Sequence, residues 1–324
     1  MVIKQRRKLG HSGLEVSPIC FGGNVFGWTI DEKTSFEILD HFVEAGGNFI
    51  DTADVYSKWV PGNQGGESEI ILGKWLKLRQ NRHQVVIATK VGSDMGVKGK
   101  GLSRQHIFQA VEDSLQRLQT DYIDLYQSHI DDETTPLEET LETYSELIRQ
   151  GKVRAIGASN YNGSRLLQAL EISRQYGYPR YESLQPRYNL YDRDDYEQNL
   201  QQICQEQGIG VINYSALASG FLSGKYRSEK DLSISLRGNS VKRYLEPRGL
   251  RILEALDQVA KTYNSTPTQI SLAWLIANPT ITAPIVSATT IEQLNDVIKA
   301  VNLQLDQDAI NILNQASSAN ALVS

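Results

Sequence analysis

Four residues of types that can move a proton follow short apolar stretches of this sequence. Asp51 and Tyr56 lie in NFIDTADVYSKW (48–59), and Lys90 and His129 end two further apolar runs. A tyrosine is a poor acid at neutral pH because its ordinary pKa is about 10, and a nearby ammonium group favours the phenolate and so lowers that pKa. We therefore expect Lys90, balanced by Asp51, to tune Tyr56 as a proton donor. A neutral His129 could orient a carbonyl oxygen, so this set of side chains could protonate a carbonyl as hydride reaches its carbon.

The same stretch holds two other charged residues for which we expect no chemical role. Asp54 and Lys58 are interpreted as solvated residues of the loop after the strand. Trp59, which follows them, either forms the wall of a pocket or packs against the loop.

Eight short apolar segments alternate with longer amphipathic ones along nearly the whole chain. Strands that are apolar throughout need cover on both faces, so this alternation predicts parallel strands with helices outside them. Eight such units predict an α/β fold, a closed (β/α)8 TIM barrel, with its active site at the carboxyl ends of the strands. A doubly wound open sheet with an appended domain is the alternative, and the lack of G-x-G-x-x-G after the first strand weighs against it. The expected strands are residues 18–22, 48–52, 85–90, 122–129, 153–160, 183–189, 210–217 and 281–288.

Helices between these strands are marked by apolar residues at helical spacing and by terminal signals. Ser103 is the expected N-cap of one helix, and Thr-Pro opens two others, at 135–136 and 266–267. Gly46 and Gly151 are expected to end the helices that precede them. The clearest helical patterns cover residues 35–46, 103–120, 135–151 and 265–279.

Three further segments lie outside the alternating pattern. Residues 3–18 alternate around HSG, which predicts a two-stranded hairpin that closes one end of the barrel. The loop after strand seven, residues 221–247, is too long for an ordinary connection and is expected to be a functional lid or disordered. Residues 314–324 are expected to form a loose tail. No linker is apparent, so we expect one domain over residues 1–324.

The composition excludes several classes of protein. The net charge of −5 and the absence of a basic run argue against partners such as nucleic acid or an anionic membrane. Cys20 and Cys204 are too few for a disulfide framework or a thiolate zinc site. No apolar run of about 18 residues occurs, and the charged amino terminus has no apolar segment behind it. We expect a soluble, cytoplasmic protein that acts on a small molecule.

Several stretches together resemble the aldo-keto reductase family, whose barrels reduce aldehydes and ketones with a nicotinamide cofactor. The resemblance runs from the hairpin to the last helix, with the motifs in family order, and the start of the chain and the long loop resemble the bacterial and potassium-channel β-subunit branch. The matching stretches are AGGNFIDTADVYS, GESEIILGKWL, VVIATKVG, DYIDLYQSHIDDETTPLEETL, GKVRAIGASNY, QPRYNL, INYSALASGFLSGKY and QISLAWLIANP.

The resemblance implies that Asp51, Tyr56, Lys90 and His129 form the catalytic tetrad, with Tyr56 as general acid. It also implies that polar residues after strands five and six bind the nicotinamide carboxamide, that Tyr214 stacks on the ring and that residues 215–225 wrap the pyrophosphate. The implied cofactor contacts are Gly22, Gly23, Asn24, Asp51, Ser159, Asn160, Gln185, Tyr214, Ser215, Leu217, Gly220, Leu222, Lys225, Ser287, Thr289 and Gln293.

The preferred cofactor is expected to be NADPH, with NADH not excluded. The family places the adenosine phosphate at a helix N-terminus after strand eight, where free N–H groups favour anions. This chain has no basic residue at 286–289 to pair with the 2′-phosphate of NADPH. Contacts to that phosphate are therefore expected from Ser287, Thr289 and an arginine of the long loop, Arg227 or Arg237. Thr290 and Gln293 have the spacing of a capping box, so Thr290 is also expected to cap the helix that follows it.

A pocket for a small carbonyl compound is expected outside the tetrad, lined by Phe26, Trp28, Trp59 and the acidic loop 130–135. Two other functions remain open at this point. A cofactor-binding regulatory module of the channel β-subunit kind could keep the same tetrad, and a lyase could use Lys90 as a Schiff-base nucleophile. The lyase leaves the cofactor-like residues of strands five to seven unexplained.

Overall fold

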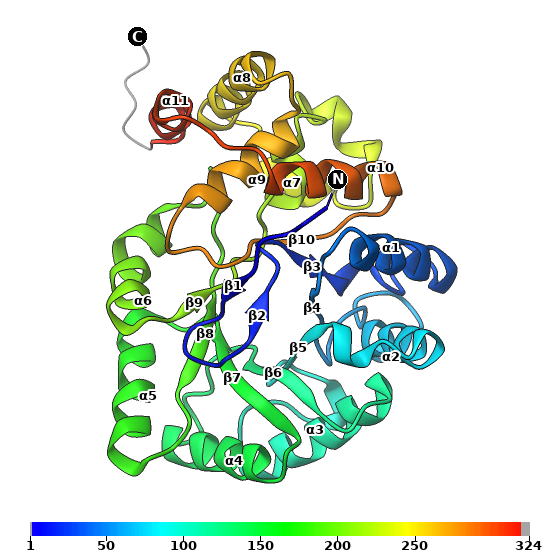
Figure 1. The fold of residues 1–324 in the computed structure, drawn as a ribbon, viewed down its shortest axis with the longest axis vertical. Helices are drawn as coiled ribbons and strands as arrows, with labels where there is room; N and C mark the ends of the chain where they lie inside the picture. Colours follow the sequence, from blue (N-terminus) through cyan, green and yellow to red (C-terminus); the bar gives the residue numbers. More distant parts are fainter. Residues whose placement is uncertain (1, 319–324) are drawn as a thin grey trace.

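The computed structural model describes residues 2–318 of the chain. Its central sheet has eight strands in the order β10-β3-β4-β5-β6-β7-β8-β9, and every neighbouring pair is parallel. Helices surround these strands on the outside (Figure 1). The strands are β3 (Cys20–Gly22), β4 (Phe49–Asp51), β5 (Val86–Val91), β6 (Ile123–Ser128), β7 (Val153–Ser159), β8 (Tyr181–Gln185), β9 (Gly210–Val211) and β10 (Ile285–Val286).

The two edge strands of this sheet meet, so the sheet closes into a barrel. Ile281, shortly before β10, forms a parallel bridge with Val211 of β9. The amide of Thr282 donates to the Val211 carbonyl at 2.8 Å, and the amide of Ile285 donates to the Asn213 carbonyl at 2.9 Å. The (β/α)8 barrel expected from the alternating pattern is thereby confirmed.

The last strands are shorter than the sequence predicts. β9 has only two residues, against the expected segment 210–217, because the chain turns out of the sheet at Ser215, whose φ is 57°. Arg187 and Tyr214 are joined by one isolated bridge where a longer strand pair was expected. The chain leaves the ladder here to form the rim of the barrel.

The helices agree with the predicted patterns to within a few residues. Ser103 caps α3 by accepting from the amide of His106, and Thr266 caps α9 by accepting from the amide of Gln269. Pro136 is the N-cap of α4 and so precedes its first turn. The α-helices are α1 (Glu32–Glu44), α2 (Glu67–Arg79), α3 (Arg104–Leu118), α4 (Leu137–Arg149), α5 (Gly163–Tyr176), α6 (Gln201–Gln207), α7 (Gly238–Val241), α8 (Pro247–Thr262), α9 (Pro267–Ala277), α10 (Ile291–Val301) and α11 (Gln307–Ser317).

A hairpin of β1 (Arg7–Lys8) and β2 (Glu15–Val16) covers the amino-terminal end of the barrel, as predicted. Leu9, Leu14 and Val16 of the hairpin belong to one buried cluster with inward-facing strand residues such as Phe49 and Val86. Because these strand residues lie near the start of their strands, the hairpin closes the end opposite the strand termini that carry the polar residues. Only the carboxyl end of the barrel can therefore admit a ligand.

The long loop, expected to be a functional lid or disordered, is ordered, and the carboxyl-terminal segment is more ordered than expected. Residues 221–247 contain a 3₁₀ helix (Glu229–Ile234), the single turn of α7 and a further 3₁₀ turn (Lys242–Tyr244). Asn314–Ser317, expected to start a loose tail, is instead the last turn of α11, which receives hydrogen bonds from Arg248 and Arg251 of α8. The rest of the expected tail, from 319 on, lies outside the described residues. Within residues 2–318, no helix has the length and apolar character needed to cross a membrane.

Candidate active site

The alternation of side chains along three adjacent strands places the predicted tetrad inside the barrel. In β5, Val86 and Ala88 face the interior core, so Lys90 two residues further on faces the same way. In β4 the same alternation carries Asp51 inward from Phe49. Strand register then determines how far along the barrel axis each side chain lies. Asp51 of β4 is the partner of Ala88 in β5, and Lys90 of β5 is the partner of Gln127 in β6. Asp51 and Lys90 meet at the carboxyl end for this reason, while Tyr56 comes from the loop after β4 and His129 directly follows β6.

Lys90 and Asp51 form a fully buried ion pair that contacts the phenol of Tyr56. Lys90 Nζ donates to Asp51 Oδ2 at 2.7 Å, to the Thr52 carbonyl at 2.8 Å and to Tyr56 Oη at 2.8 Å. Tyr56 Oη donates to Asp51 Oδ2 at 3.1 Å, and Gln185 Nε2 donates to Asp51 Oδ1 at 2.9 Å. All three protons of the ammonium group therefore have acceptors, and the carboxylate is held by several donors.

The pKa of Tyr56 differs from the sequence expectation. Burial, followed by the negative charge and hydrogen bond of Asp51, raises the pKa of Tyr56 well above its ordinary value. The net direction is therefore opposite to the predicted lowering, because desolvation and the Asp51 carboxylate dominate. Tyr56 holds its proton at neutral pH, which is the form that a proton donor needs.

His129 lies beside Tyr56 and is neutral. The two ring centroids are 6.1 Å apart with an interplanar angle of 74°. Burial, and then the charge of Lys90, lowers the pKa of His129 to about 3. His129 Nδ1 has no hydrogen-bond partner among the described residues. A neutral imidazole next to the phenol can hydrogen-bond to a substrate oxygen without adding charge to the site.

The low pKa of His129 makes a prediction for the pH profile of any turnover at this site. Because the ring stays neutral above about pH 4, kcat/KM is expected to be flat between about pH 5 and pH 7, with no limb near the ordinary histidine pKa of about 6.5. The measurement is a pH series of kcat/KM on wild type and His129→Gln. A limb near pH 6.5 that disappears in the variant would contradict the neutral histidine.

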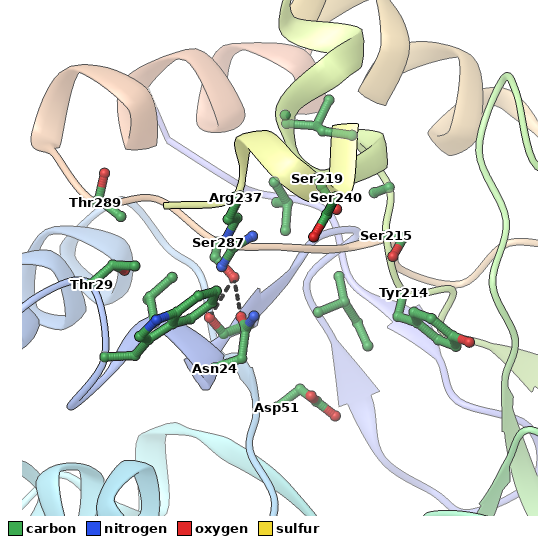
Figure 2. Close-up of a pocket in the computed structure, with 18 of the residues that line it drawn as sticks. Asn24, Thr29, Asp51, Tyr214, Ser215, Ser219, Arg237, Ser240, Ser287 and Thr289 are labelled. Atoms are coloured by element: carbon green, nitrogen blue, oxygen red, sulfur yellow. Dashed lines mark hydrogen bonds between the residues drawn. The ribbon is translucent and has the colours of Figure 1, made fainter. Parts of the chain in front are cut away.

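A cavity of about 880 Å³ opens from this tetrad along the carboxyl face of the barrel. Figure 2 shows Asp51 and Tyr214 at one side of it and Thr289 and Thr29 at the other. Tyr56, Trp28, Trp59 and His129 also line it, as do most of the predicted cofactor residues: Gly22, Asn24, Asp51, Ser159, Asn160, Gln185, Tyr214, Ser215, Leu217, Gly220, Lys225, Ser287, Thr289 and Gln293. One continuous cavity therefore joins the tetrad to these positions.

Polar groups next to the tetrad are fixed by hydrogen bonds to one another. Asn160, in the left-handed region at φ 58°, donates from Nδ2 to the His129 carbonyl at 2.9 Å. Tyr214 Oη donates to Asn160 Oδ1 at 2.9 Å, and Ser159 Oγ donates to the Gln185 carbonyl at 3.0 Å. The Tyr214 ring lies at the cavity wall, where it can offer a flat apolar surface.

The segment after β9 turns sharply along the cavity wall. Ser215, Ala218 and Ser219 have positive φ values of 57°, 49° and 59°, and Gly220 follows at 94°. The amides of Ala218 and Gly220 donate to the carbonyls of Ser215 and Leu217. Lys225 also lines the cavity, and its side chain lies next to Gly220. The segment therefore brings polar backbone and one ammonium group to the cavity wall.

The opposite arm of the cavity runs between β3 and the start of α10. Ser287 Oγ lies 2.7 Å from the Gly22 carbonyl oxygen and 2.6 Å from Asn24 Oδ1, and its single proton is donated to one of the two at a time (Figure 2). A Cβ at Gly22 would lie 2.7 Å from Ser287 Oγ, so only glycine allows this close approach. Thr290 caps α10 as expected, whereas Gln293 accepts from the amide of Thr289 at 2.9 Å instead of completing a capping box.

Four predicted site residues do not line the cavity, and neither does any residue of the loop 130–135 that was expected to wall the pocket. Lys90 is 0% exposed and contacts the cavity residues Asp51 and Tyr56 without lining the cavity itself. Phe26 is fully buried and stacks on Phe21 at 5.6 Å, so it belongs to the core and not to a substrate pocket. Leu222 is also fully buried, and its carbonyl accepts from Ser271 of α9. Gly23 packs below the surface against the backbone of Asp51. These corrections follow from neighbouring positions alternating between core and cavity, which sequence spacing does not resolve at a strand end.

The cavity includes residues that the sequence did not single out. Ser235, Leu236 and Ser240 of the long loop line it, next to Arg237. The unusual length of this loop indicated a functional segment, but no motif marked which residues reach the cavity. Arg237 Nη2 is shielded from solvent and has no partner among the described residues, and the guanidinium lies 4.9 Å from the Trp28 ring.

Arg227, the other candidate arginine of the loop, points elsewhere. Its guanidinium forms two hydrogen bonds of 2.8 Å to the carboxylate of Asp257 in α8. It does not line the cavity. Of the two arginines, only Arg237 is available to a ligand there.

Asp54 is a buried residue, so its interpretation as a solvated loop residue is wrong. Its side chain is 2% exposed, and neither carboxyl oxygen has a partner among the described residues. Burial, and then the charge of Glu69, raises the pKa of Asp54 to about 8, although Arg117 and Lys90 oppose this. Lys58 lies nearer the surface and pairs with Asp94 at 3.6 Å, which links the loops after β4 and β5.

The raised pKa of Asp54 predicts how stability changes with pH. Between about pH 4 and pH 8 the folded chain keeps a proton on Asp54 that the unfolded chain releases. The free energy of unfolding therefore decreases as pH rises through this range because of Asp54. The gap between 3.8 and about 8 corresponds to at most about 6 kcal/mol. Asp54→Asn is expected to raise Tm relative to wild type at pH 8 and much less at pH 4.5. An equal effect of Asp54→Asn at both pH values, measured by thermal unfolding, would show that Asp54 ionises normally.

Fold and cavity together define a (β/α)8 barrel with a polar site at its carboxyl face, and comparison with known proteins gives the family. A sequence model described as "Aldo/keto reductase family" matches residues 18–318. The chain therefore belongs to the aldo/keto reductase family, an oxidoreductase family that generally uses nicotinamide cofactors and acts on small carbonyl compounds.

Similar proteins come from bacteria, fungi and plants. The "Uncharacterized oxidoreductase YrpG" of Bacillus subtilis (strain 168) is 37% identical over 94% of this chain and 94% of its own. The "Norsolorinic acid reductase" of Aspergillus flavus is 31% identical over 94% of this chain and 79% of its own. A "Probable voltage-gated potassium channel subunit beta" of Arabidopsis thaliana is 33% identical over 92% of each chain.

Proposed function

We propose that this protein reduces aldehydes or ketones to alcohols with NADPH, with Tyr56 as the proton donor. The observation that carries the proposal is the contact of Lys90 Nζ with both Tyr56 Oη at 2.8 Å and Asp51 Oδ2 at 2.7 Å, next to a neutral His129. A protonated phenol can transfer its proton to a carbonyl oxygen, and the adjacent ammonium group stabilises the phenolate that remains.

The residues present fit a nicotinamide dinucleotide. The cavity of about 880 Å³ offers a polar cluster beside the tetrad, the turning segment 215–220 with Lys225, and the solvent-shielded, unpartnered Nη2 of Arg237. Asn160 and Gln185 would hold the carboxamide, and Tyr214 would lie on the ring. When bound there, the reduced nicotinamide supplies a hydride to the carbonyl carbon.

In the reaction, the chain positions the carbonyl and transfers one proton. His129 would donate a hydrogen bond to the substrate oxygen and so set its place beside Tyr56 Oη. The phenol proton, which points to Asp51 Oδ2 in this structure, turns to that oxygen as charge develops on it. Asp51 and Gln185 then keep Lys90 in place next to the phenolate. Enclosure of these groups by the barrel strengthens each interaction.

Arg237 supports NADPH as the preferred cofactor. Burial lowers the pKa of Arg237 and leaves a cation without a counter-charge, so an anion from the ligand would stabilise it. We expect Arg237→Ala to weaken NADPH binding by about 10- to 100-fold, the loss of one charge-assisted hydrogen bond, and NADH binding by less. Fluorescence titration with both cofactors measures this. Arg227→Ala, from the same loop but outside the cavity, is the matched control, and equal losses in the two variants would contradict a phosphate contact of Arg237.

The similarity to plant channel β-subunits keeps a cofactor-binding regulatory module as the second candidate. Titration with NADPH and NADH, followed by an aldehyde panel monitored at the nicotinamide absorbance, separates the two functions. Binding with turnover supports the reductase, and binding without turnover of any carbonyl favours the regulatory module. No binding of either cofactor would defeat both. The Schiff-base lyase is disfavoured because the Lys90 side chain is 0% exposed and does not line the cavity, so a substrate carbonyl does not meet it there.

A further inference from the structure

Ser57, the residue directly after Tyr56, has an unusual backbone conformation. Its φ is 71°, in the left-handed region that residues with a side chain rarely adopt. The residue is fully buried, so its side chain is not there to meet solvent. Because glycine would adopt this conformation at lower cost, a serine here points to a role for its hydroxyl group.

The hydroxyl of Ser57 links the loop that carries Tyr56 to the segment after β3. Ser57 Oγ donates to the Phe26 carbonyl at 2.7 Å, and Phe26 is fixed in the core, where its ring stacks on that of Phe21. The hydrogen bond is buried, so water does not compete for either group. The backbone one residue beyond Tyr56 is therefore held against a rigid support.

Two further side chains connect the same two parts of the chain. Asn63 Nδ2 donates to the Gly27 carbonyl at 3.2 Å and to the Ser57 carbonyl at 3.0 Å. Ser68 Oγ, at the start of α2, donates to the Gly23 carbonyl at 2.8 Å. The segment after β3 and the loop after β4 are thus joined at three points by hydrogen bonds from side chain to backbone.

The segment after β3 forms one wall of the cavity. Asn24, Trp28 and Thr29 of this segment line the cavity, and Figure 2 shows Asn24 and Thr29 there. Tyr56 and Trp59 line it from the loop after β4, and the rings of Trp28 and Trp59 are 5.4 Å apart. For a ligand on the first wall, the place of the phenol therefore depends on how the two loops are joined.

Tyr56 is held at two ends, and one of them changes during the proposed reaction. At the hydroxyl, Tyr56 Oη contacts Lys90 Nζ at 2.8 Å and Asp51 Oδ2 at 3.1 Å. When the phenol proton turns to a substrate oxygen, the hydrogen bond to Asp51 is given up. The ring is then placed by the Lys90 contact and by its backbone, which Ser57 anchors.

Resting on the proposed reductase function, we propose that Ser57 is a positioning residue for the proton transfer. Its hydroxyl holds the Tyr56 loop on the segment after β3 and so sets where the phenol lies relative to a ligand on that wall of the cavity. An error of about 1 Å in such a placement can lower a rate by about 100-fold. The left-handed backbone at Ser57 is the conformation that brings its hydroxyl to the Phe26 carbonyl.

Ser57→Gly and Ser57→Ala separate positioning from stability. Both variants lack the hydroxyl, but only glycine adopts a φ of 71° freely, so Tm is expected to fall further in Ser57→Ala than in Ser57→Gly. At a temperature at which both are folded, kcat with NADPH and the best substrate of the aldehyde panel is expected to fall by about 10-fold in both. The Kd for NADPH, measured by fluorescence titration, is expected to change by less than about two-fold, since Ser57 does not line the cavity.

Gln119→Gly is the matched control. Gln119 has a φ of 52° at the C-cap of α3 and lies outside the cavity, so glycine relieves the same kind of strain away from the site. This variant is expected to keep the wild-type kcat, with a Tm at or above that of wild type. A fall of kcat as large as that in Ser57→Gly would overturn the inference, because relief of strain alone would then account for it.

Two other results would also overturn the inference. One is a kcat that follows Tm, falling in Ser57→Ala and staying at the wild-type value in Ser57→Gly, because the hydroxyl would then act through stability alone. The other is a loss of NADPH affinity as large as the fall in kcat. If Ser57→Ala does not fold, kcat of Ser57→Gly against Gln119→Gly still decides. Turnover of no aldehyde by wild type overturns the reductase function and this inference with it, whereas wild-type turnover with an unchanged kcat in Ser57→Gly overturns the inference alone.

Discussion

Replacement of Tyr56 by phenylalanine is expected to lower kcat for aldehyde reduction by about 10²- to 10⁴-fold and to change the Kd for NADPH by less than about two-fold. The reason is that the variant keeps the ring, which packs against Trp59 at 6.0 Å and His129 at 6.1 Å, and loses only the hydroxyl that carries the proton. Steady-state kinetics and a fluorescence titration with NADPH measure the two quantities separately.

The matched control is Tyr191→Phe. It also removes a hydroxyl that donates to a carboxylate, that of Glu246 at 2.9 Å, but it lies outside the cavity. A general effect of losing a hydroxyl would appear in both variants, whereas the loss of a proton donor appears only at Tyr56. Turnover near the wild-type rate in Tyr56→Phe would remove Tyr56 from the chemistry.

Replacement of Lys90 by methionine is expected to abolish most turnover and to destabilise the fold. The ammonium group is 0% exposed and pairs with Asp51, itself 1% exposed, so its removal leaves a buried carboxylate without a counter-charge. Breaking a buried ion pair on one side typically costs about 3–5 kcal/mol in the free energy of unfolding. Chemical denaturation measures the stability, and kcat is expected to fall by at least about 10²-fold because the phenolate of Tyr56 loses its stabilising cation.

The double variant Asp51→Asn with Lys90→Met separates the two effects. It removes both charges, so it should regain much of the stability that Lys90→Met loses while turnover stays low. If Lys90→Met unfolds at the wild-type denaturant concentration, the buried pair is not the stabilising contact described above. Recovery of turnover in the double variant would mean that neither group acts on Tyr56.

The barrel was predictable because its signal repeats eight times along the chain. Each strand had a run of apolar residues and several helices had a separate helical pattern, so small errors at element ends did not alter the architecture. The errors lie where tertiary geometry decides. β9 ends at Val211 because the chain turns toward the rim. The last turn of α11 forms where Arg251 of α8 donates a hydrogen bond to the Ala316 carbonyl. The organisation as one domain over residues 1–324 stays a prediction.

The candidate site was predictable to the extent that it follows from strand ends. Asp51 and Lys90 converge because alternation and register carry them inward, and both rules can be read from sequence. The orphaned Nη2 of Arg237 and the burial of Asp54 could not be foreseen, since both depend on how a loop packs against distant elements. The direction of the Tyr56 pKa was missed for a similar reason, because burial can only be weighed once the surroundings are known.

The most direct test of the account is the transfer of label from NADPH carrying deuterium at C4 of the nicotinamide to 4-methylbenzaldehyde. Wild type is expected to produce 4-methylbenzyl alcohol with deuterium on the carbinol carbon, detected by NMR, and Tyr56→Phe is expected to bind the same cofactor but to form little labelled alcohol. Wild-type protein that binds NADPH and forms no labelled alcohol from this or any other carbonyl compound would contradict it.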